Sequence, residues 1–310
     1  MKTAITGATG FIGKGLTELL LANGHEVIVL SRNSQQAELE FDKRVRTLRW
    51  SADNKAVLLK ELDGIDAIVN LAGENIGSSL WTASKRKRII ESRLAAGRIV
   101  TDVVASLSRK PGVLIQASAV GLYGSRGDDI LDETSPAGDG FLADVVGRWE
   151  ESTKEVEAFG VRRVVIRTGV VFASNGGALP KLAMPYRLLF GTVLGSGKQW
   201  VPWIHYLDEL EAIHFLLTQK FSTGVYNLVA PNPSRMEDVC AAIGEALHRP
   251  TVMRVPGSLL KLAMGKMAEE TILPSQRVVP SKLAQAGFAF KHAGVKTAIC
   301  QLLSRRDDGR

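Results

Sequence analysis

Short apolar runs alternate with helical patterns along most of the chain. The apolar runs that fit buried strands lie at residues 2–6, 26–30, 45–50, 66–71, 113–116, 163–171 and 224–229. Between them, apolar residues recur at the three- and four-residue spacing of amphipathic helices, most clearly from Thr82 to Ser108. Strands that alternate with helices pair in parallel, because each crossover needs a helix. The pattern predicts an α/β fold with a doubly wound, seven-stranded parallel sheet.

Three glycines at three-residue spacing follow the first strand and open the first helix: Gly7, Gly10 and Gly13. Between strand and helix, this spacing is the fingerprint of a Rossmann-type dinucleotide site. The first glycine permits a tight turn, the second lets the backbone approach a pyrophosphate, and the third lets the helix pack closely. Amides at the helix start favour the anion. We therefore predict that this turn binds the cofactor, with contacts from Thr9, Phe11 and Ile12.

The second strand ends in Ser31-Arg32, where such folds meet the adenosine ribose. An acid there binds a free 2′-hydroxyl, whereas an arginine accommodates a 2′-phosphate. No Asp or Glu competes for the position, so Ser31 and Arg32 predict NADP(H) as the cofactor. The alternative, an ordinary surface arginine, stays open.

Further cofactor contacts are expected from residues that follow other strands. Leu71, Ala72 and Gly73 come after the fourth strand and are small enough to lie along ribose and phosphate. Arg93, on the long helix, is a candidate for the pyrophosphate, and Val171, at the end of the sixth strand, for the nicotinamide. The basic run Lys85–Arg88 at the start of that helix is interpreted as a solvated face.

Two lobes are expected from this arrangement. We assign residues 1–170, with roughly 204–230, to an NADP-binding Rossmann domain. Residues 171–203 and 231–310 form a smaller, interleaved C-terminal substrate lobe.

The fifth strand ends at Ser118 and is followed by Leu-Tyr123-Gly. Here the chain resembles extended short-chain dehydrogenases/reductases of the epimerase/dehydratase kind, which carry a serine at this strand end. The resemblance implies a catalytic serine with a Tyr-x-x-x-Lys pair, in which the ammonium lowers the pKa of the phenol. The positions that match the pair here are Phe141 and Val145, and no Tyr-x-x-x-Lys occurs anywhere in the chain.

Longer stretches resemble one subgroup of atypical members, the "epimerase family proteins" with a C-terminal domain of unknown function. These stretches are Ser31-Arg32, Asn70–Asn75, Glu91–Leu94, Trp149-Glu150, Gly176–Ala178 and Gln276–Pro280, and the C-terminal match covers residues 255–303. The resemblance implies NADP binding without Tyr-x-x-x-Lys, and it implies no particular substrate.

Composition and charge limit the kinds of partner, metal site and location that we expect for the chain. The chain has 310 residues, 45% of them apolar, a net charge of +7 and two cysteines. The charge suits an anionic cofactor, and without aromatic interleaving or a recognition motif we expect no nucleic-acid partner.

The cysteines are too few for a zinc site or a disulfide framework, so we expect free thiols and no metal. His205 and His214 are interpreted as structural. No apolar run is long enough to cross a bilayer, and no cleavable leader is expected, which predicts a cytoplasmic protein without a membrane partner.

Two functions are compatible with these features. The first is an NADP-dependent oxidoreductase or epimerase on a small polar substrate, in which Ser118 orients the reacting oxygen and Tyr123 donates the proton. The second is an NADPH-binding sensor or regulatory protein with little or no turnover, which explains the missing pair. A homodimer is kept as a further candidate assembly.

Overall fold

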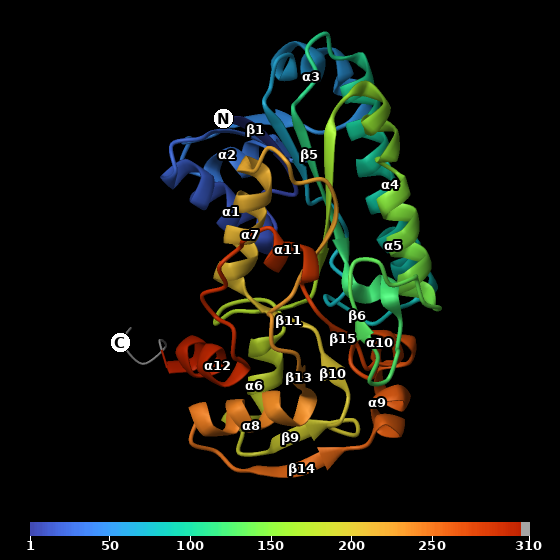
Figure 1. Ribbon diagram of the computed structural model, residues 1–310, viewed down its shortest axis with the longest axis vertical. Coiled ribbons are helices and arrows are strands. Elements are labelled where there is room, and N and C mark those ends of the chain that lie inside the picture. The colour runs from blue at the N-terminus through green and yellow to red at the C-terminus, as the bar shows by residue number, and fades with distance from the viewer. Residues whose placement is uncertain (305–310) are drawn as a thin grey trace.

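A seven-stranded parallel sheet forms the centre of the larger lobe (Figure 1). The computed structural model describes residues 1–304, so the last six residues of the predicted second lobe lie outside the described part. The strand order is β12-β7-β5-β4-β1-β2-β3. The strands are β1 (Lys2–Thr6), β2 (Glu26–Ser31), β3 (Arg46–Arg49), β4 (Ala67–Asn70), β5 (Val113–Ala119), β7 (Arg162–Thr168) and β12 (Gly224–Leu228). This confirms the predicted Rossmann-type sheet.

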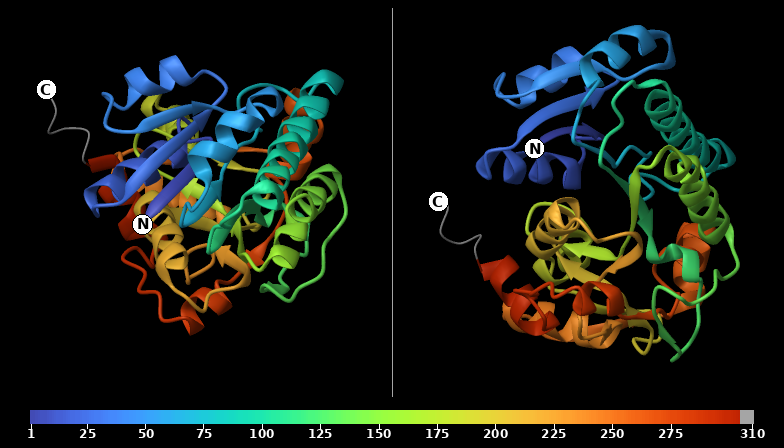
Figure 2. Two further views of the ribbon diagram at one scale, coloured as in Figure 1. Left: turned by 90° about the horizontal axis from the view of Figure 1, so that it is seen from above. Right: turned by 45° about the horizontal axis from the view of Figure 1, so that its top comes forward.

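Helices cover both faces of the sheet (Figures 1 and 2). One face carries α1 (Phe11–Ala22), α2 (Ser34–Glu40), α7 (Tyr206–Thr218) and α11 (Ser281–Gln285). The other carries α3 (Lys55–Leu62), α4 (Ala83–Ser106) and α5 (Phe141–Glu151). The order reverses between β4 and β1, so the carboxyl ends of these two strands form the crevice where doubly wound folds bind nucleotides.

The predicted sixth strand is interrupted at Gly169. A Cβ there would collide with the backbone oxygen of Pro202, and the next amide, of Val170, donates to that oxygen at 2.6 Å. The chain therefore leaves the sheet after Thr168 and continues as β8 (Val170–Phe172), which pairs with β11 (Trp203–His205) in the smaller lobe.

The smaller lobe has its own core, at the bottom of Figure 1. It contains α6 (Leu179–Arg187), α8 (Met236–Ala246), α9 (Gly257–Met264), α10 (Lys266–Thr271) and α12 (Val295–Ser304). Short strands pair within it: β9 (Gly191–Leu194) with β14 (Thr251–Val255), and β10 (Trp200–Val201) with β13 (Ser234–Arg235). A further pair, β6 (Ile130–Leu131) with β15 (Arg277–Val278), joins the chain after β5 to the C-terminal segment. The remaining short elements are 3₁₀ turns at Ala52–Asn54, Val120–Tyr123 and Lys154–Phe159.

Candidate cofactor crevice and active site

The glycine turn is packed too tightly for side chains at its first and third glycines. Gly7 has a φ of 71°, and a Cβ there would lie 2.8 Å from the carbonyl carbon of Leu71. A Cβ on Gly13 would collide with the oxygen of Gly7 and lie 2.7 Å from the Cα of Ala8. At Gly7 the turn therefore packs backbone against backbone on the loop after β4.

The start of α1 has no side-chain cap. Gly10 occupies the N-cap position in an extended conformation, and no acidic residue lies in the first turn. The first amides of a helix have no intrahelical acceptor, so they favour an anion at this point. Thr9 is exposed beside them, while Ile12 packs against the core. Phe11 stacks on Tyr206 with ring centroids 4.6 Å apart, and the Tyr206 hydroxyl donates to the Phe11 oxygen. The free amides and the absence of an acidic side chain at the start of α1 fit a dinucleotide pyrophosphate.

The loop after β4 continues this surface. The amides of Leu71 and Ala72 donate to the backbone oxygen and to the hydroxyl of Thr6, respectively. A Cβ on Gly73 would lie 3.2 Å from the Cζ of Arg93. The Arg93 guanidinium donates to the carbonyl oxygens of Glu74 and Ile89. Burial lowers the pKa of Arg93 to about 10. In this structure Arg93 therefore holds the loop, and its predicted contact with the pyrophosphate stays a prediction.

Several cations surround the carboxylate of Glu74 in the same loop. The Nζ of Lys85 lies 2.7 Å from Glu74 Oε1 and also donates to the hydroxyl of Ser78. The hydrogen bond from Lys85 and the charges of Arg88 and Arg32 lower the pKa of Glu74. Lys85 is 2% exposed, so interpreting the whole Lys85–Arg88 run as a solvated face was wrong for this residue. The sequence held one indication of this burial. Lys85 lies one turn after the N-cap residue, Thr82, at the start of a helix that directly follows the loop containing Glu74.

The predicted ribose contacts, Ser31 and Arg32, lie at the carboxyl end of β2. Arg32 is exposed, and the Ser31 hydroxyl donates to the backbone oxygen of Asn33. Val171, the predicted nicotinamide contact, lies in β8, where its carbonyl accepts the amide of Ala178. The structure brings Gly7–Gly13 and Leu71–Gly73 together, and the predicted cofactor role of each residue stays a prediction.

Ser118 and Tyr123 are joined by a buried network that the sequence did not predict. The Ser118 hydroxyl donates to Glu150 Oε1 at 2.5 Å. Arg167 clamps the same carboxylate through two bonds of 2.8 and 3.0 Å and donates to the Tyr123 hydroxyl at 2.9 Å. That hydroxyl in turn donates to Asn227 Oδ1 at 2.7 Å. The signal in the sequence was Arg167, which follows three β-branched residues in a buried strand, because a buried charge needs a partner.

The surroundings of Tyr123 do not support its predicted role as proton donor. The side chain is 0% exposed, and its proton is used within the protein. Burial raises the pKa of the phenol, and the nearby charge of Arg167 only partly opposes this. Phe141, at the position expected for the catalytic tyrosine, packs edge-on against Trp81 with centroids 5.2 Å apart. Ser118 is 4% exposed, and its hydroxyl proton is donated to Glu150. The Ser118 oxygen can therefore accept a hydrogen bond from a ligand but cannot donate one.

A second buried carboxyl lies at the end of β7. Glu209 is 0% exposed, and its Oε1 accepts the hydroxyl of Thr168 at 2.7 Å. Within residues 1–304, no hydrogen-bond partner reaches its Oε2. Burial raises the pKa of Glu209 to about 8.

The contacts of the two histidines are compatible with the predicted structural role, which stays a prediction. Nδ1 of His205 accepts the amide of Leu207 and so caps α7, and His214 packs edge-on against His25. The two cysteines are free thiols, as predicted.

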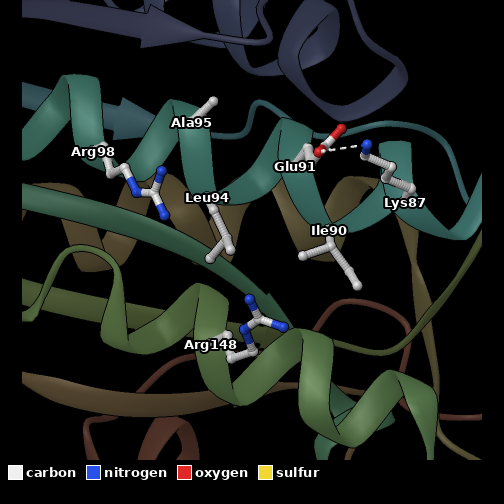
Figure 3. Close-up of a pocket in the computed structure, with 7 residues that line it drawn as sticks. All are labelled: Lys87, Ile90, Glu91, Leu94, Ala95, Arg98 and Arg148. Carbon is white, nitrogen blue, oxygen red and sulfur yellow. Dashed lines mark ion pairs between the residues drawn. The ribbon is translucent and has the colours of Figure 1, made fainter.

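Two cavities lie near these elements. One, of about 190 Å³, adjoins Tyr206 and so lies beside the glycine turn; it is lined by Ala173, Ser174, Asn175, His205, Tyr206, Leu207, Gln301 and Leu302. The other, of about 440 Å³, lies between α4 and α5 (Figure 3).

Comparison with known proteins identifies the family. The model of the NAD dependent epimerase/dehydratase family matches residues 3–228, and a domain of unknown function, DUF1731, matches residues 255–302. The chain belongs to the NAD dependent epimerase/dehydratase family. An epimerase family protein of Bacillus subtilis, YfhF, is 36% identical over 307 residues, which cover 99% of each chain.

Other relatives of this family extend the comparison. A chloroplastic homologue of SDR39U1 from Arabidopsis thaliana is 36% identical and covers 96% of this chain and 86% of its own length. The crystal structure of human SDR39U1 with NADPH shares 29% identity, has a TM-score of 0.86 and covers 98% and 99% of the two chains. A Thermus thermophilus UDP-glucose 4-epimerase with NAD, at 19% identity and a TM-score of 0.78, shares the fold. The neighbours thus bind either NADPH or NAD.

None of the described helices is both long and apolar enough to cross a membrane.

Proposed function

We propose that this protein binds NADP(H) in the crevice between β1 and β4 and acts as an oxidoreductase or epimerase on a small polar substrate. The observation that carries the proposal is the uncapped start of α1 beside a turn whose glycines leave no room for a Cβ. The NADPH in the human relative's structure supports it.

The residues of the crevice have separate tasks in this proposal. Amides at the start of α1 hold the pyrophosphate, and Arg32 pairs with the 2′-phosphate. Bound there, the nicotinamide would supply hydride transfer. Because the Ser118 proton is donated to Glu150, Ser118 accepts a hydrogen bond from a substrate hydroxyl rather than donating one to a carbonyl. Tyr123 has no part in proton transfer.

Calorimetry with NADP⁺ and NAD⁺ tests the binding. We expect NADP⁺ to bind more tightly, and Arg32→Glu to weaken NADP⁺ by at least about tenfold, because a lost charge-assisted contact costs about 1.5–3 kcal/mol. NAD⁺ affinity should hardly change. Arg187→Glu, on the exposed side of α6, is the matched control. No heat with either nucleotide would disprove the proposal, and equal affinities would disprove its preference for NADP.

A second function, that of an NADPH-binding sensor, is favoured by one observation. Both hydroxyls predicted for catalysis donate their protons inside the protein, to Glu150 and Asn227. NADPH fluorescence followed with a panel of aldehydes, ketones and sugars separates the two functions. Consumption of NADPH supports an oxidoreductase, and an epimerised sugar product, which forms without net consumption of the cofactor, supports an epimerase. Binding with neither outcome supports the sensor. For either function we propose a cytoplasmic location, which suits the two free thiols.

A further inference from the structure

The end of the smaller lobe that points away from the larger lobe carries a cluster of exposed apolar side chains (Figure 1). The cluster lies on the turn after α6 and on β14, and its members are between 49% and 61% exposed: Leu188, Leu189, Phe190, Val252 and Met253. The two segments lie side by side, because β9 starts at Gly191, which pairs with Thr251 of β14. α9 begins two residues after β14 and adds Leu262, which is 84% exposed. We call these six apolar residues the distal face.

The backbone at Leu189 is held in the left-handed region, with a φ of 68°. Leu189 follows the C-cap residue of α6, Leu188, at a position where glycine is preferred because a Cβ is unfavourable there. Hydrogen bonds from the amides of Leu189 and Phe190 to the carbonyl oxygens of Tyr186 and Pro185 fix this turn. The Leu189 side chain is mostly exposed, so burial within the protein does not offset the strain. A strained turn that holds large apolar side chains in solvent is typical of a binding surface.

The two stretches of chain that contain the distal face have no acidic residue. They run from Ser174 to Leu207 and from Ala246 to Ala268. The acids at either end of the second stretch, Glu245 and Glu269, each pair with a lysine, at 2.9 and 3.5 Å. Negative charge is therefore scarce around the distal face.

Three arginines border the distal face. Arg187 adjoins the turn after α6, Arg249 precedes β14, and Arg254 lies within β14. All three are exposed, and none forms an ion pair with another residue of the described range 1–304. Exposed apolar side chains beside unpaired cations suit an anionic bilayer, because the apolar groups enter the boundary of headgroups and acyl chains while the cations meet lipid phosphates.

The irregularity of β14 argues against a protein partner that would extend the β9–β14 pair. Its register shifts between Thr251 and Met253, so Val252 has no partner in β9. A bulged edge strand of this kind hinders the addition of a further strand. Strand addition by a second copy or by another protein is therefore disfavoured.

We propose that the distal face binds to the surface of an anionic lipid bilayer, with Leu189 and Phe190 entering the bilayer and the three arginines at lipid phosphates. The proposal goes beyond cofactor binding, since the distal face lies at the opposite end of the smaller lobe from the glycine turn (Figure 1). The expectation of no membrane partner rested on the lack of an apolar run that could cross a bilayer. Contact with one surface of a bilayer needs no such run.

Co-sedimentation of the full chain with lipid vesicles tests this proposal. One set of vesicles consists of phosphatidylcholine alone, and the other of phosphatidylcholine and phosphatidylglycerol in equal amounts. We expect binding to the anionic vesicles to be at least about tenfold tighter, and to weaken as salt rises, because each basic residue near an anionic surface adds to the attraction. No binding to the anionic vesicles, or equal binding to both sets, would overturn the proposal.

Matched apolar variants locate the contact. Leu189→Asn with Phe190→Ser should weaken binding to the anionic vesicles by at least about tenfold, because less apolar surface is then buried in the bilayer. Asparagine tolerates the left-handed backbone, so this double variant should stay folded, which circular dichroism checks. Leu39→Asn with Phe221→Ser makes the same changes at two exposed positions outside the distal face and should leave binding unchanged. Unchanged binding by the first double would place the contact elsewhere and overturn the proposal.

Charge variants test the role of the arginines. Arg187→Glu with Arg249→Glu should remove the preference for anionic vesicles, whereas Lys55→Glu with Lys60→Glu, two exposed cations on α3, should keep it. A preference that survives in the arginine double would overturn the proposal. So would a dimer in lipid-free sedimentation that Leu189→Asn with Phe190→Ser separates, because a second copy would then cover the distal face.

Discussion

The two halves of the candidate site are built in opposite ways. Around Gly7–Gly13 the surface is made of backbone, and the amides at the start of α1 have no side-chain cap. At the ends of β5 and β7, by contrast, every polar side chain of the network has a partner within the protein: Ser118 with Glu150, Glu150 with Arg167, and Tyr123 with Asn227. An open set of donors suits a ligand, whereas a satisfied network suits stability. We call the region around Gly7–Gly13 the open half and the region at the ends of β5 and β7 the closed half. Substitutions should lower cofactor affinity in the open half and the stability of the fold in the closed half.

Breaking the ion pair at the centre of the closed half should have the largest effect. Arg167→Met leaves the Glu150 carboxylate buried without its cation, which costs about 3–5 kcal/mol in comparable pairs. Urea unfolding should show this loss. The double variant with Glu150→Gln should recover part of it, because no charge is then left unpaired. Unchanged stability together with lost turnover would instead make Arg167 part of the chemistry and remove the contrast between the halves.

The buried carboxyl of Glu209 makes the stability of the closed half depend on pH. Its pKa is about 8 in the folded protein and about 4.3 in an unfolded chain, so the folded state holds the proton more tightly. Stability therefore falls as pH rises from about 4.5 to 8 and levels off above that range. Glu209→Gln keeps an acceptor for Thr168 and should be stabilising, most of all above pH 8.

Unfolding midpoints in urea between pH 5 and 9 measure this dependence. Glu155→Gln, an exposed position, is the control and should leave the pH profile unchanged. A gain from Glu209→Gln that is the same at pH 5 and pH 9 would show that Glu209 does not titrate in this range.

The open half should respond to added volume. Gly13→Ala puts a methyl group against the oxygen of Gly7, so α1 must move away from the turn. Overpacking of this kind costs about 1–3 kcal/mol, and we expect NADP⁺ affinity to fall by more than about tenfold in calorimetry. Gly147→Ala is the matched control, because its Cβ would meet only Leu122 Cδ1, at 3.8 Å, and helix propensity favours alanine. Normal NADP⁺ affinity in Gly13→Ala would show that the turn does not hold the cofactor.

The sequence predicted the open half better than the closed half, for a physical reason. Gly7, Gly10 and Gly13 are adjacent in the chain, and their spacing alone specifies the turn that they form. The sheet was predicted for a similar reason, because each buried strand is a local apolar run. Glu150 and Arg167 lie on α5 and β7, so only the fold shows that they meet at Ser118. The break after Thr168 likewise depends on Pro202, more than thirty residues away.

Removing one hydroxyl from the closed half should have the smallest effect. Tyr123→Phe deletes the bond to Asn227 and the one from Arg167, and we expect a loss of about 1–2 kcal/mol in urea unfolding. Any consumption of NADPH should continue at a similar rate, because the hydroxyl is enclosed and its proton is already donated. Tyr226→Phe is the control, since no hydrogen bond of its hydroxyl is found within residues 1–304. If Tyr123→Phe abolished turnover but left stability and NADP⁺ affinity intact, the phenol would reach the substrate after all, and the closed half would have to open during the reaction.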